Sequence, residues 1–378
     1  MNKKLLFISS IPSHPVTAGN RTSMRNYVEL LKKNGYEVYY FFITINVEQP
    51  DVIPMLEYWG ENLYIYHPPF YKWQLRVMKY YRLLTRKNLV YNVDDWTPIG
   101  ASGKLKKMCK KYHFEAVMIN YIWLSKLLKG LTCKVKIIHT HDVYSFRNER
   151  LGTKWFSVTP EQEAKALNRA DVSLAVQEDE GIFFRFLTKN KIVVTFCPFP
   201  FVMSEKSNID NILFFSSNNI QNIKGISWWI DKVFVKIKQK YPTTSLLIGG
   251  SICGSIQKYK FVDGIKILGE FEKVEEFYKL GEIVINPIYS GTGLKIKTIE
   301  ALAFNKILVL HPHNIIGLPF KNDIPVFLAE NEDENIKNIG KIFENPSHIE
   351  AYKKRIYEYM VKYNNLIEDR INPLLNSD

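Results

Sequence analysis

The sequence contains few cysteines and no long apolar segment. Its 378 residues include only four cysteines, Cys109, Cys133, Cys197 and Cys253, which lie far apart and form no Cys-x-x-Cys pair. This spacing indicates neither a zinc knuckle nor a disulfide framework, so we expect reduced thiols in a cytoplasmic protein. No stretch approaches the roughly 18 consecutive apolar residues of a membrane span, so any membrane contact is expected to be peripheral.

The N-terminal segment also lacks the length of a secretory signal. Its apolar run, Leu5 to Ile8, is shorter than the roughly 7 to 15 residues of a signal-peptide core. Pro12 and His14 follow this run at once. The run is better explained as a first buried β-strand.

The sequence contains fewer acidic than basic residues. Lysine and arginine total 51 against 38 aspartate and glutamate residues, which gives a net charge of +13. Such an excess favours anionic partners, namely phosphate-bearing substrates, nucleic acid or an acidic lipid surface, and selects none of them. Lysines are scattered over both halves and no nucleic-acid reader motif occurs, so we expect no nucleic-acid partner.

The length and the alternation of short apolar runs with helical periodicity predict two α/β domains. Expected strands cover residues 5–9, 38–45, 116–120, 135–139 and 172–176, then 212–216, 245–248, 265–268 and 282–286. Expected helices cover residues 24–33, 160–168, 228–240 and 350–364. A Pro- and Ser-containing stretch between residues 197 and 208 indicates a linker. The predicted domains are residues 1–203 and 204–359, with a helix in 360–378 packing back on the first.

The most informative motif lies between residues 285 and 303, where a strand leads through a glycine-containing loop into a helix expected to begin near residue 293. Gly291 and Gly293 allow the backbone to approach a ligand, and free amides at the helix start favour an anion. Lys295 and Lys297 add positive charge. Glu300 follows Lys297 by three residues, so it lies on the same helix face, where a carboxylate can accept hydrogen bonds from two vicinal hydroxyls. A nucleoside diphosphate sugar presents a diphosphate and a diol together. The simpler alternative is a connection whose lysines only face solvent.

This segment resembles the donor-site motif of the retaining glycosyltransferase family 4, whose members have the GT-B fold, two Rossmann-like doubly wound domains facing each other across a cleft. Many members carry two glutamates with seven residues between them. Glu300 matches the second, whereas Thr292 occupies the place of the first, so the carboxylate used on the transferred sugar is missing here. The resemblance implies a donor-binding set of Gly291, Thr292, Gly293, Leu294, Lys295, Lys297 and Glu300.

The resemblance extends along nearly the whole chain. Residues 215–225 resemble the first unit of the family's C-terminal domain, with Lys224 in the position of the diphosphate-binding lysine. The partner arginine would fall near Asn218 and is absent. In the first half, Gly19 with Asn20 resembles the glycine loop that approaches the donor phosphates. An exposed lysine before a glycine is also often a helix-end feature, which is the alternative for Lys224.

Residues 138–142 resemble a strand that ends in the family's His-Asp pair near the transferred sugar, which makes His141 and Asp142 the expected catalytic residues. Their place at the carboxyl end of a parallel strand suits a ligand site. The alternatives are a structural histidine and a turn-forming or helix-capping aspartate. We expect His139 to point to the opposite face from His141, so that only one of the two lines the cleft.

One further segment, residues 71–87, is basic and aromatic. It is consistent with a helix that rests on an anionic membrane. An ordinary amphipathic helix packed on the first domain explains it equally well.

The resemblance implies a retaining hexosyltransferase that moves a sugar from a UDP- or GDP-sugar to a glycan or lipid-linked acceptor in bacterial surface polysaccharide synthesis, such as capsule, O-antigen or exopolysaccharide. It also implies metal-independent chemistry with no cofactor, at the inner face of the plasma membrane. The alternatives are a GT-B-like nucleotide-sugar epimerase and a basic nucleic-acid-binding protein. A nicotinamide-dependent oxidoreductase is disfavoured, because neither half has Gly-x-Gly-x-x-Gly directly after a strand.

Overall fold

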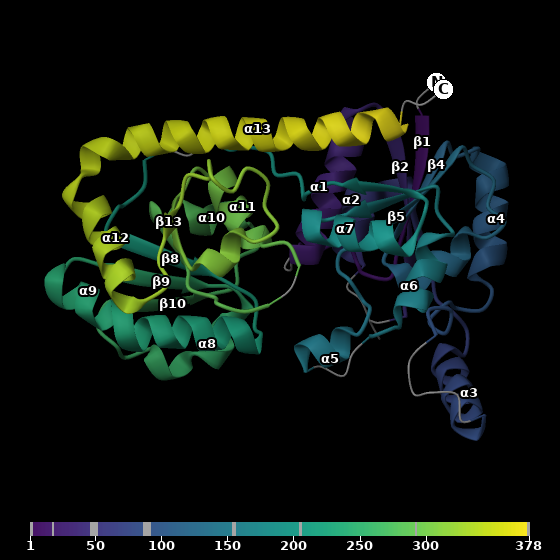
Figure 1. Cartoon of the computed structure of the whole chain (residues 1–378), viewed down its shortest axis with the longest axis horizontal. Coiled ribbons are helices and arrows are strands. Elements are labelled where there is room, and N and C mark those ends of the chain that lie inside the picture. The colour runs from purple at the N-terminus through teal and green to yellow at the C-terminus, as the bar shows by residue number, and fades with distance from the viewer. Residues whose placement is uncertain are drawn as a thin grey trace. The chain divides into compact units, whose positions relative to one another are not determined.

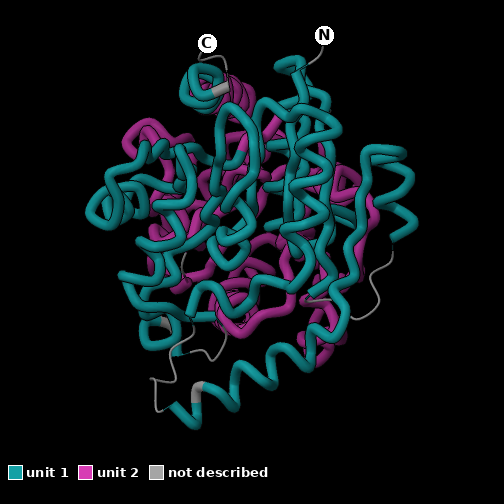
Figure 2. Tube along the Cα trace, turned by 90° about the vertical axis from the view of Figure 1, so that its right-hand side faces the viewer, with its two compact units in different colours: residues 1–16, 20–197, 367–378 teal, residues 17–19, 198–366 magenta. Residues whose placement is uncertain are grey.

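The computed structural model describes residues 3–16, 19–45, 52–85, 92–152, 156–203, 206–291 and 293–375. The chain forms two compact units, which Figure 2 shows in different colours. The first contains residues 1–16, 20–197 and 367–378, and the second contains residues 17–19 and 198–366. The change of unit after residue 197 falls at the start of the Pro-containing stretch that the sequence indicates as a linker.

A parallel sheet of seven strands forms the centre of the first unit. Its order is β3-β2-β1-β4-β5-β6-β7. The strands are β1 (Lys3–Ser9), β2 (Tyr36–Ile43), β3 (Leu63–Tyr66), β4 (Ala116–Asn120), β5 (Val135–His139), β6 (Val172–Ala175) and β7 (Lys191–Val194). Every residue from Leu5 to Ile8 is fully buried. This agrees with a central parallel strand, which is apolar on both faces because helices cover both.

Helices connect these strands (Figure 1). They are α1 (Gly19–Lys33), α2 (Ile53–Trp59), α3 (Tyr71–Leu84), α4 (Ala101–Tyr112), α5 (Arg147–Leu151), α6 (Pro160–Leu167) and α7 (Glu178–Leu187), with 3₁₀ turns at Gly60–Asn62 and Ile122–Leu128. The predicted start of α6 is confirmed in detail. Thr159 is its N-cap and accepts a hydrogen bond from the Gln162 amide, while Pro160 fills the first turn.

A second parallel sheet, ordered β10-β9-β8-β11-β12-β13, forms the centre of the second unit. Its strands are β8 (Asn211–Phe215), β9 (Ser245–Gly249), β10 (Ile265–Gly269), β11 (Ile283–Asn286), β12 (Ile307–Leu310) and β13 (Phe327–Leu328). Both sheets thus place their first strand beside their fourth, and the strand order reverses there. Such a reversal opens a crevice at the carboxyl ends of the two strands, where doubly wound folds bind ligands.

The helices of the second unit begin with α8 (Ile220–Trp229), which continues through a π-helical turn (Ile230–Phe234) into α9 (Val235–Lys240). The others are α10 (Val274–Tyr278), α11 (Ile296–Ala303), α12 (Glu332–Glu344) and α13 (Ile349–Leu375), with 3₁₀ turns at Ser251–Ser255, Gln257–Tyr259, Pro312–Ile315 and Pro346–His348. The predicted helix start at Trp228 is wrong by eight residues. Asn219 begins α8, because its side chain accepts a hydrogen bond from the Asn222 amide.

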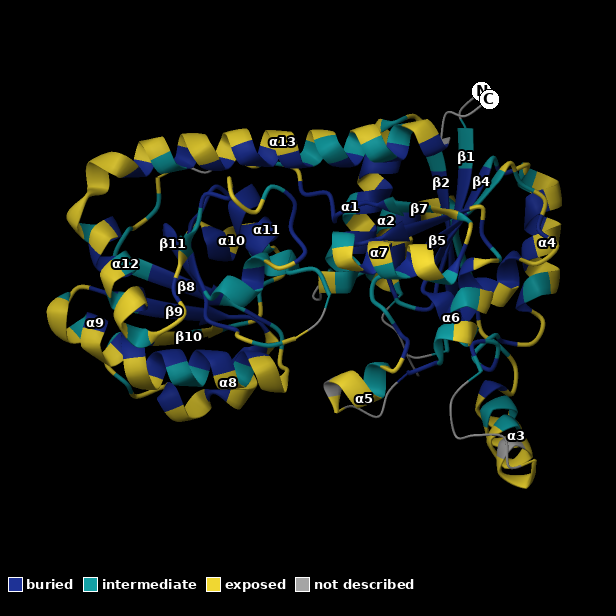
Figure 3. Cartoon of the chain, viewed as in Figure 1, coloured by how far each residue is buried: buried dark blue, intermediate teal, exposed yellow. Residues whose placement is uncertain are grey.

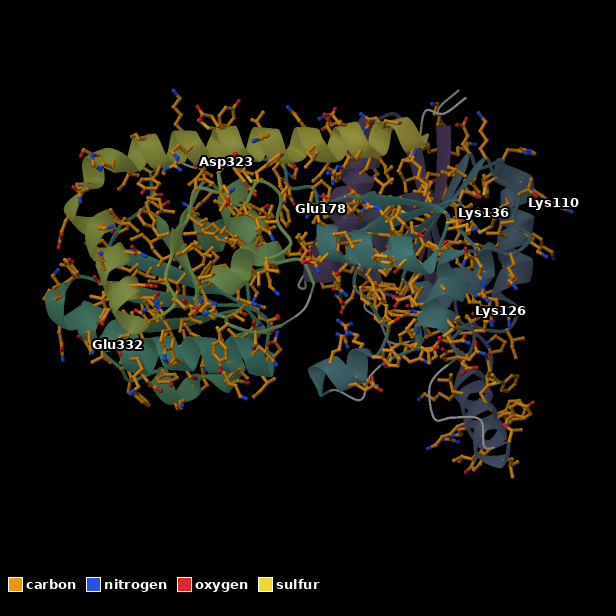
Figure 4. The ribbon with its side chains drawn as sticks, viewed as in Figure 1. Lys110, Lys126, Lys136, Glu178, Asp323 and Glu332 are labelled. Atoms are coloured by element: carbon orange, nitrogen blue, oxygen red, sulfur yellow. The ribbon has the colours of Figure 1, made fainter. Side chains whose placement is uncertain are left out.

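Helix α13 is longer than the predicted 350–364 and contributes to both units. One stripe of it is buried at helical spacing: Ile356, Tyr359, Met360, Tyr363, Ile367, Ile371 and Leu374. Within the first unit, Arg370 forms an ion pair of 3.0 Å with Glu178, which Figure 4 labels at the start of α7. Arg370 also donates to the Val194 carbonyl. These contacts hold the end of α13 on the first unit.

All four cysteines are free thiols. Among the residues that the structure describes, no helix combines the length and the apolar character needed to cross a bilayer.

Candidate functional site

Two of the residues predicted to bind the donor, Lys297 and Glu300, lie on the helix that follows β11 in the second unit, near the carboxyl ends of β8 and β11. This is the reversal point of that sheet, since β8 pairs with both β9 and β11. Glycine allows the surrounding segments to pack closely. A Cβ atom on Gly225 of α8 would lie 3.2 Å from the Pro287 carbonyl oxygen in the loop that follows β11. The close packing of α8 against this loop therefore requires a residue without a side chain at position 225.

The loop from Pro287 to Lys295 has the conformation that its glycines allow. Gly291 and Gly293 have φ values of +129° and +72°, a region that disfavours other residues. The Gly291 carbonyl accepts a hydrogen bond of 3.2 Å from Lys295 Nζ, and His313 Nε2 lies 3.1 Å from the same oxygen. The Lys295 ammonium thus lies over the loop. Thr292, predicted in the donor set, lies outside the described residues, and Leu294 follows Gly293 in the same loop.

The helix after this loop begins at Ile296, three residues later than predicted, with Lys295 at its N-cap position. No side chain caps it. The Ile296 and Thr298 amides of this turn donate to the Leu294 and Lys295 carbonyls, which leaves the Lys297 amide for a ligand. The helix dipole favours an anion at this end, so the predicted anion site would lie at the first turn of α11 and not at residue 293.

Lys297 reaches from α11 across the reversal point to β8. Its Nζ donates to the Ser216 hydroxyl, which directly follows β8, and lies 5.9 Å from the centre of the Phe214 ring. Burial lowers the pKa of the Lys297 ammonium to about 8, although the Glu300 carboxylate opposes this shift. A solvent-facing lysine would not be placed in this way, so that alternative is wrong for Lys297.

Glu300 lies one turn further along α11 and is buried. It accepts a hydrogen bond of 3.1 Å from the Tyr278 hydroxyl. Burial raises the pKa of Glu300 to about 7, while the Tyr278 hydrogen bond and the Lys297 charge act in the opposite direction. Tyr278 in turn stacks on Phe304 with ring centres 4.6 Å apart. The carboxylate is therefore held rigidly beside the Lys297 ammonium.

Lys224 lies within α8 and is exposed. Its alternative explanation as a helix-end residue is wrong, because α8 continues to Trp229 and then into the π-helical turn. Lys224 directly precedes Gly225, the residue at which α8 approaches the loop after β11.

In the first unit, His141 and Asp142 follow β5, as predicted, and lie near the reversal point between β1 and β4. His141 Nε2 lies 3.0 Å from Asn120 Oδ1 at the end of β4, and its ring stacks on Tyr121 at 4.4 Å. Asn20 of α1 donates a 3.2 Å hydrogen bond to the Tyr121 hydroxyl. One cluster thus joins α1, β4 and β5. Gly19, the other predicted residue of this segment, is the first residue of α1.

The expected opposite orientations of His139 and His141 are not observed. Their ring centres lie 3.9 Å apart. The expectation misapplied strand alternation, because residues two apart in a strand face the same side of the sheet. His141 itself has a φ of +67°, at the point where the chain leaves β5. Burial and the neighbouring His139 hold the pKa of His141 well below its usual range, so His141 is a neutral imidazole.

Asp142 is held in its turn by two hydrogen bonds. Its carboxylate accepts from the Val143 amide at 2.9 Å, as a turn-forming aspartate does, and from Arg147 Nε at 2.9 Å. Nearby, Glu180 of α7 is buried, and burial together with the Asp142 charge raises its pKa to about 8. Two carboxyl groups from separate elements, Asp142 after β5 and Glu180 of α7, therefore lie close enough to interact electrostatically.

Sequence reasoning missed the residues that support this site: Asn120, Tyr121, Ser216, Tyr278 and Glu180. A signal was present for three of them. Asn120 ends a predicted strand and Tyr121 follows it, while Ser216 ends another, and the ends of parallel strands meet at one edge of a sheet. Tyr278 and Glu180 come from α10 and α7, and only tertiary contact brings them to their partners.

A family model described as glycosyl transferases group 1 matches residues 210–345. No curated protein matches the chain in sequence. Sucrose-phosphate synthase from Thermosynechococcus elongatus is similar in structure, with a TM-score of 0.61, 16% identity and coverage of 98% of each chain. S. aureus TarM, in a complex with Fondaparinux, alpha-GlcNAc-glycerol and UDP, has a TM-score of 0.69 at 11% identity over 99% of this chain and 100% of TarM. A putative UDP-N-acetylglucosamine 2-epimerase from Listeria monocytogenes has a TM-score of 0.61 at 10% identity, over 100% and 98%.

The predicted fold class is confirmed, because each unit has a doubly wound parallel sheet and the structural likeness extends over the full length of GT-B proteins. The family match covers the unit that contains Lys297 and Glu300. The chain thus has the GT-B fold, and its residues 210–345 match the glycosyl transferases group 1 family.

Proposed function

We propose that the chain is a retaining hexosyltransferase of glycosyltransferase family 4, which uses a nucleoside diphosphate sugar as donor and a glycan or a lipid-linked molecule as acceptor. The observation that carries the proposal is the pair of Lys297 and Glu300 at the reversal point of the group 1 domain. An ammonium and a carboxylate one turn apart match a diphosphate and a vicinal diol.

In the proposed complex, the donor diphosphate lies at the first turn of α11. The Lys297 amide and the ammonium groups of Lys295 and Lys297 would bind its oxygens, with Lys224 and the Gly19 backbone as further contacts. Glu300 would accept hydrogen bonds from the two ribose hydroxyls, as its ionised form has acceptors only. Uridine is the preferred base in this proposal, since TarM and an alpha-glucosyltransferase of similar fold were solved with UDP or UDP-glucose.

The chemistry follows from where charge develops. As the bond between the sugar and the diphosphate breaks, negative charge grows on the leaving oxygen, and fixed cations and amides stabilise that charge more than they stabilise the intact donor. Lys297 is suited to this because Ser216 fixes its position and its surroundings exclude much water. These protein cations would neutralise the diphosphate themselves, so the proposed reaction is metal-independent.

Retention of the anomeric configuration is part of the proposal. The resemblance places Thr292 where many family members carry a glutamate, so front-face substitution assisted by the departing phosphate is the expected route. In the first unit, neutral His141, oriented by Asn120, and Asp142, held by Arg147, would contact the sugar and the acceptor hydroxyl.

The proposed physiological role is bacterial surface polysaccharide synthesis at the cytoplasmic face of the membrane, where a lipid-linked acceptor would be met. The similarity to an epimerase supports the alternative function. Assaying donor consumption with and without acceptor separates the two, because an epimerase converts its substrate without an acceptor.

Calorimetric titration with UDP and GDP tests the donor site. The informative variants are Lys297→Met and Glu300→Gln, which keep side-chain length and remove charge. We expect each to weaken binding by roughly tenfold or more, since a hydrogen bond to a charged group contributes about 1.5–3 kcal/mol. Lys337→Met, a charge removal on the exposed face of α12, is the matched control. Unchanged affinity for UDP and GDP in both site variants would refute the proposed donor site.

A further inference from the structure

Helix α3 has three distinct faces, and only one of them packs on the first unit. Residues along a helix turn by about 100° each, which places Tyr71, Gln74, Leu75 and Met78 on one side. These are the buried or half-buried residues of the helix. Helix α3 therefore packs on the first unit as an amphipathic helix does. Its two other faces remain exposed, so the packing does not rule out contact with a membrane.

The packed face is fixed by hydrogen bonds at the start of the helix. The Tyr71 hydroxyl donates to the Trp96 carbonyl at 3.1 Å. Gln74 donates to the Thr97 carbonyl and accepts from the Ile99 amide. Figure 1 shows that α3 extends from this attachment away from the sheet of the first unit. The first turn of α3 is thus fixed to the first unit, and the later turns are exposed.

The second face is apolar and exposed. Trp73, Val77, Tyr80 and Leu84 follow one another at helical spacing within roughly 60° of arc, with Tyr81 at their edge. The exposed fractions of Trp73, Tyr80 and Leu84 are 64%, 65% and 84%. Figure 3 shows the outer turns of α3 mostly in the colour of exposed residues. Large apolar residues in a continuous exposed stripe indicate an interaction surface.

The third face is cationic. Lys72, Arg76 and Lys79 lie along the side of the apolar stripe, and all three are exposed. Residues 71–84 contain no aspartate or glutamate, and Arg86 and Lys87 follow in the sequence. An apolar stripe flanked by cations, with Trp and Tyr among its apolar residues, has the charge and shape of a helix that lies in a lipid interface.

We propose that α3 binds an anionic bilayer surface. Trp73, Tyr80 and Leu84 enter the boundary between headgroups and acyl chains, and Lys72, Arg76 and Lys79 contact lipid phosphates. Charge complementarity selects anionic lipid over a neutral surface, because the flank has three cations and no acid. This inference rests on the proposed function in one respect, since a lipid-linked acceptor would be met at that surface.

The test is co-sedimentation of the full chain with vesicles of phosphatidylcholine alone or of equal parts phosphatidylcholine and phosphatidylglycerol. One variant combines Trp73→Ser, Tyr80→Ser and Leu84→Ser, and a second combines Lys72→Gln, Arg76→Gln and Lys79→Gln. The matched control replaces Lys106, Lys107 and Lys110 of α4 by Gln, with the same change in charge on exposed residues. Calorimetry with UDP on each variant reports separately on the donor site.

We expect the chain to bind only the anionic vesicles, and less well as salt rises. Loss of the three α3 cations should lower the partition coefficient by roughly 100-fold, the apolar variant should also bind less, and the α4 control should bind as before. Equal binding to both vesicle types, no binding to either, or binding unaffected by the α3 variants would each overturn the proposal. So would an α3-dependent dimer in size-exclusion chromatography without vesicle binding. Normal UDP affinity in any of these cases leaves the proposed function standing.

Discussion

Lys297 and Glu300 lie one turn apart on α11, and burial moves the pKa values of their side chains toward each other, to about 8 and about 7. Each charge moderates the shift of the other. Both groups are therefore largely ionised together only in a narrow range around pH 7 to 8, and a ligand that needs the ammonium and the carboxylate at once is bound best there.

The affinity for UDP should accordingly pass through a maximum near pH 7.5. Above pH 8, Lys297 loses the proton that gives it charge. Below pH 7, Glu300 gains a proton and loses acceptor capacity for the ribose hydroxyls. Calorimetric titrations on both sides of the maximum measure the two limbs. Lys297→Met should abolish the loss of affinity above pH 8. Glu300→Gln should reduce the loss of affinity below pH 7. The part of that loss that remains comes from the nucleotide phosphate, which itself titrates near pH 6. A profile identical in wild type and both variants would contradict the assignment.

The second unit should be strongly destabilised by Glu282→Ala. The buried Glu282 carboxylate is 3.0 Å from Lys353 Nζ and 4.0 Å from Lys306 Nζ, and it accepts from the Ser207 amide. Its removal leaves buried ammonium groups without a counter-charge, which costs about 3–5 kcal/mol. Urea denaturation followed by tryptophan fluorescence measures the loss.

The neighbouring lysines provide the control for this cluster. Lys353→Met should destabilise, whereas Lys354→Met should have little effect, since the Lys354 side chain is 78% exposed and its partner Glu358 is exposed as well. Equal effects of the two lysine substitutions would show that the buried cluster does not stabilise the unit.

Gly225→Val should lower both thermal stability and UDP affinity. The added side chain would meet Pro287 and Ile288, whose atoms lie 3.2–3.3 Å from an ideal Cβ. It would push α8 away from the loop that leads to Gly291, and overpacking of this kind costs about 1–3 kcal/mol. Gly103→Val, in an exposed helical position with open space around it, is the matched variant. Differential scanning fluorimetry compares them, and an equal melting temperature for the two would argue against close packing at Gly225.

Asn120→Asp should raise the pKa of His141, because it places a carboxylate about 3 Å from Nε2, where an opposite charge favours the imidazolium. In the wild type, we expect the His141 ring to stay neutral throughout the acidic range in which exposed histidines titrate. Histidine-labelled NMR spectra recorded against pH measure both, with His141→Gln to assign the signal. A His141 signal that titrates near pH 6.5 in the wild type would refute the burial of this ring.

The sequence predicted most of the strands, but β3, β7, β12 and β13 were missed. Buried parallel strands are short apolar runs bounded by polar loops, and β4 and β5 match their predicted bounds to the residue. Helix α8 was placed poorly, because the Asn219 cap and the following Ile220 carry a weaker signal than the Trp228-Trp229 pair.

The site could be predicted only where local pattern determines it. The i, i+3 relation of Lys297 and Glu300 follows from helix geometry. The burial that moves their pKa values, and the partners Ser216 and Tyr278, depend on other elements. The proximity of His139 and His141 was missed because the two positions were assigned to opposite faces, whereas residues two apart in a strand share one face.

The complete burial of the Lys306 side chain has a practical consequence. Burial lowers the pKa of its amine to about 8, so a larger fraction of it is unprotonated at neutral pH than of an ordinary lysine. Reagents that acylate amines attack the unprotonated form, yet none can reach a side chain with no exposed surface. Acylation of Lys306, followed by mass spectrometry, would therefore report transient opening of the second unit, and binding of the proposed donor should slow it.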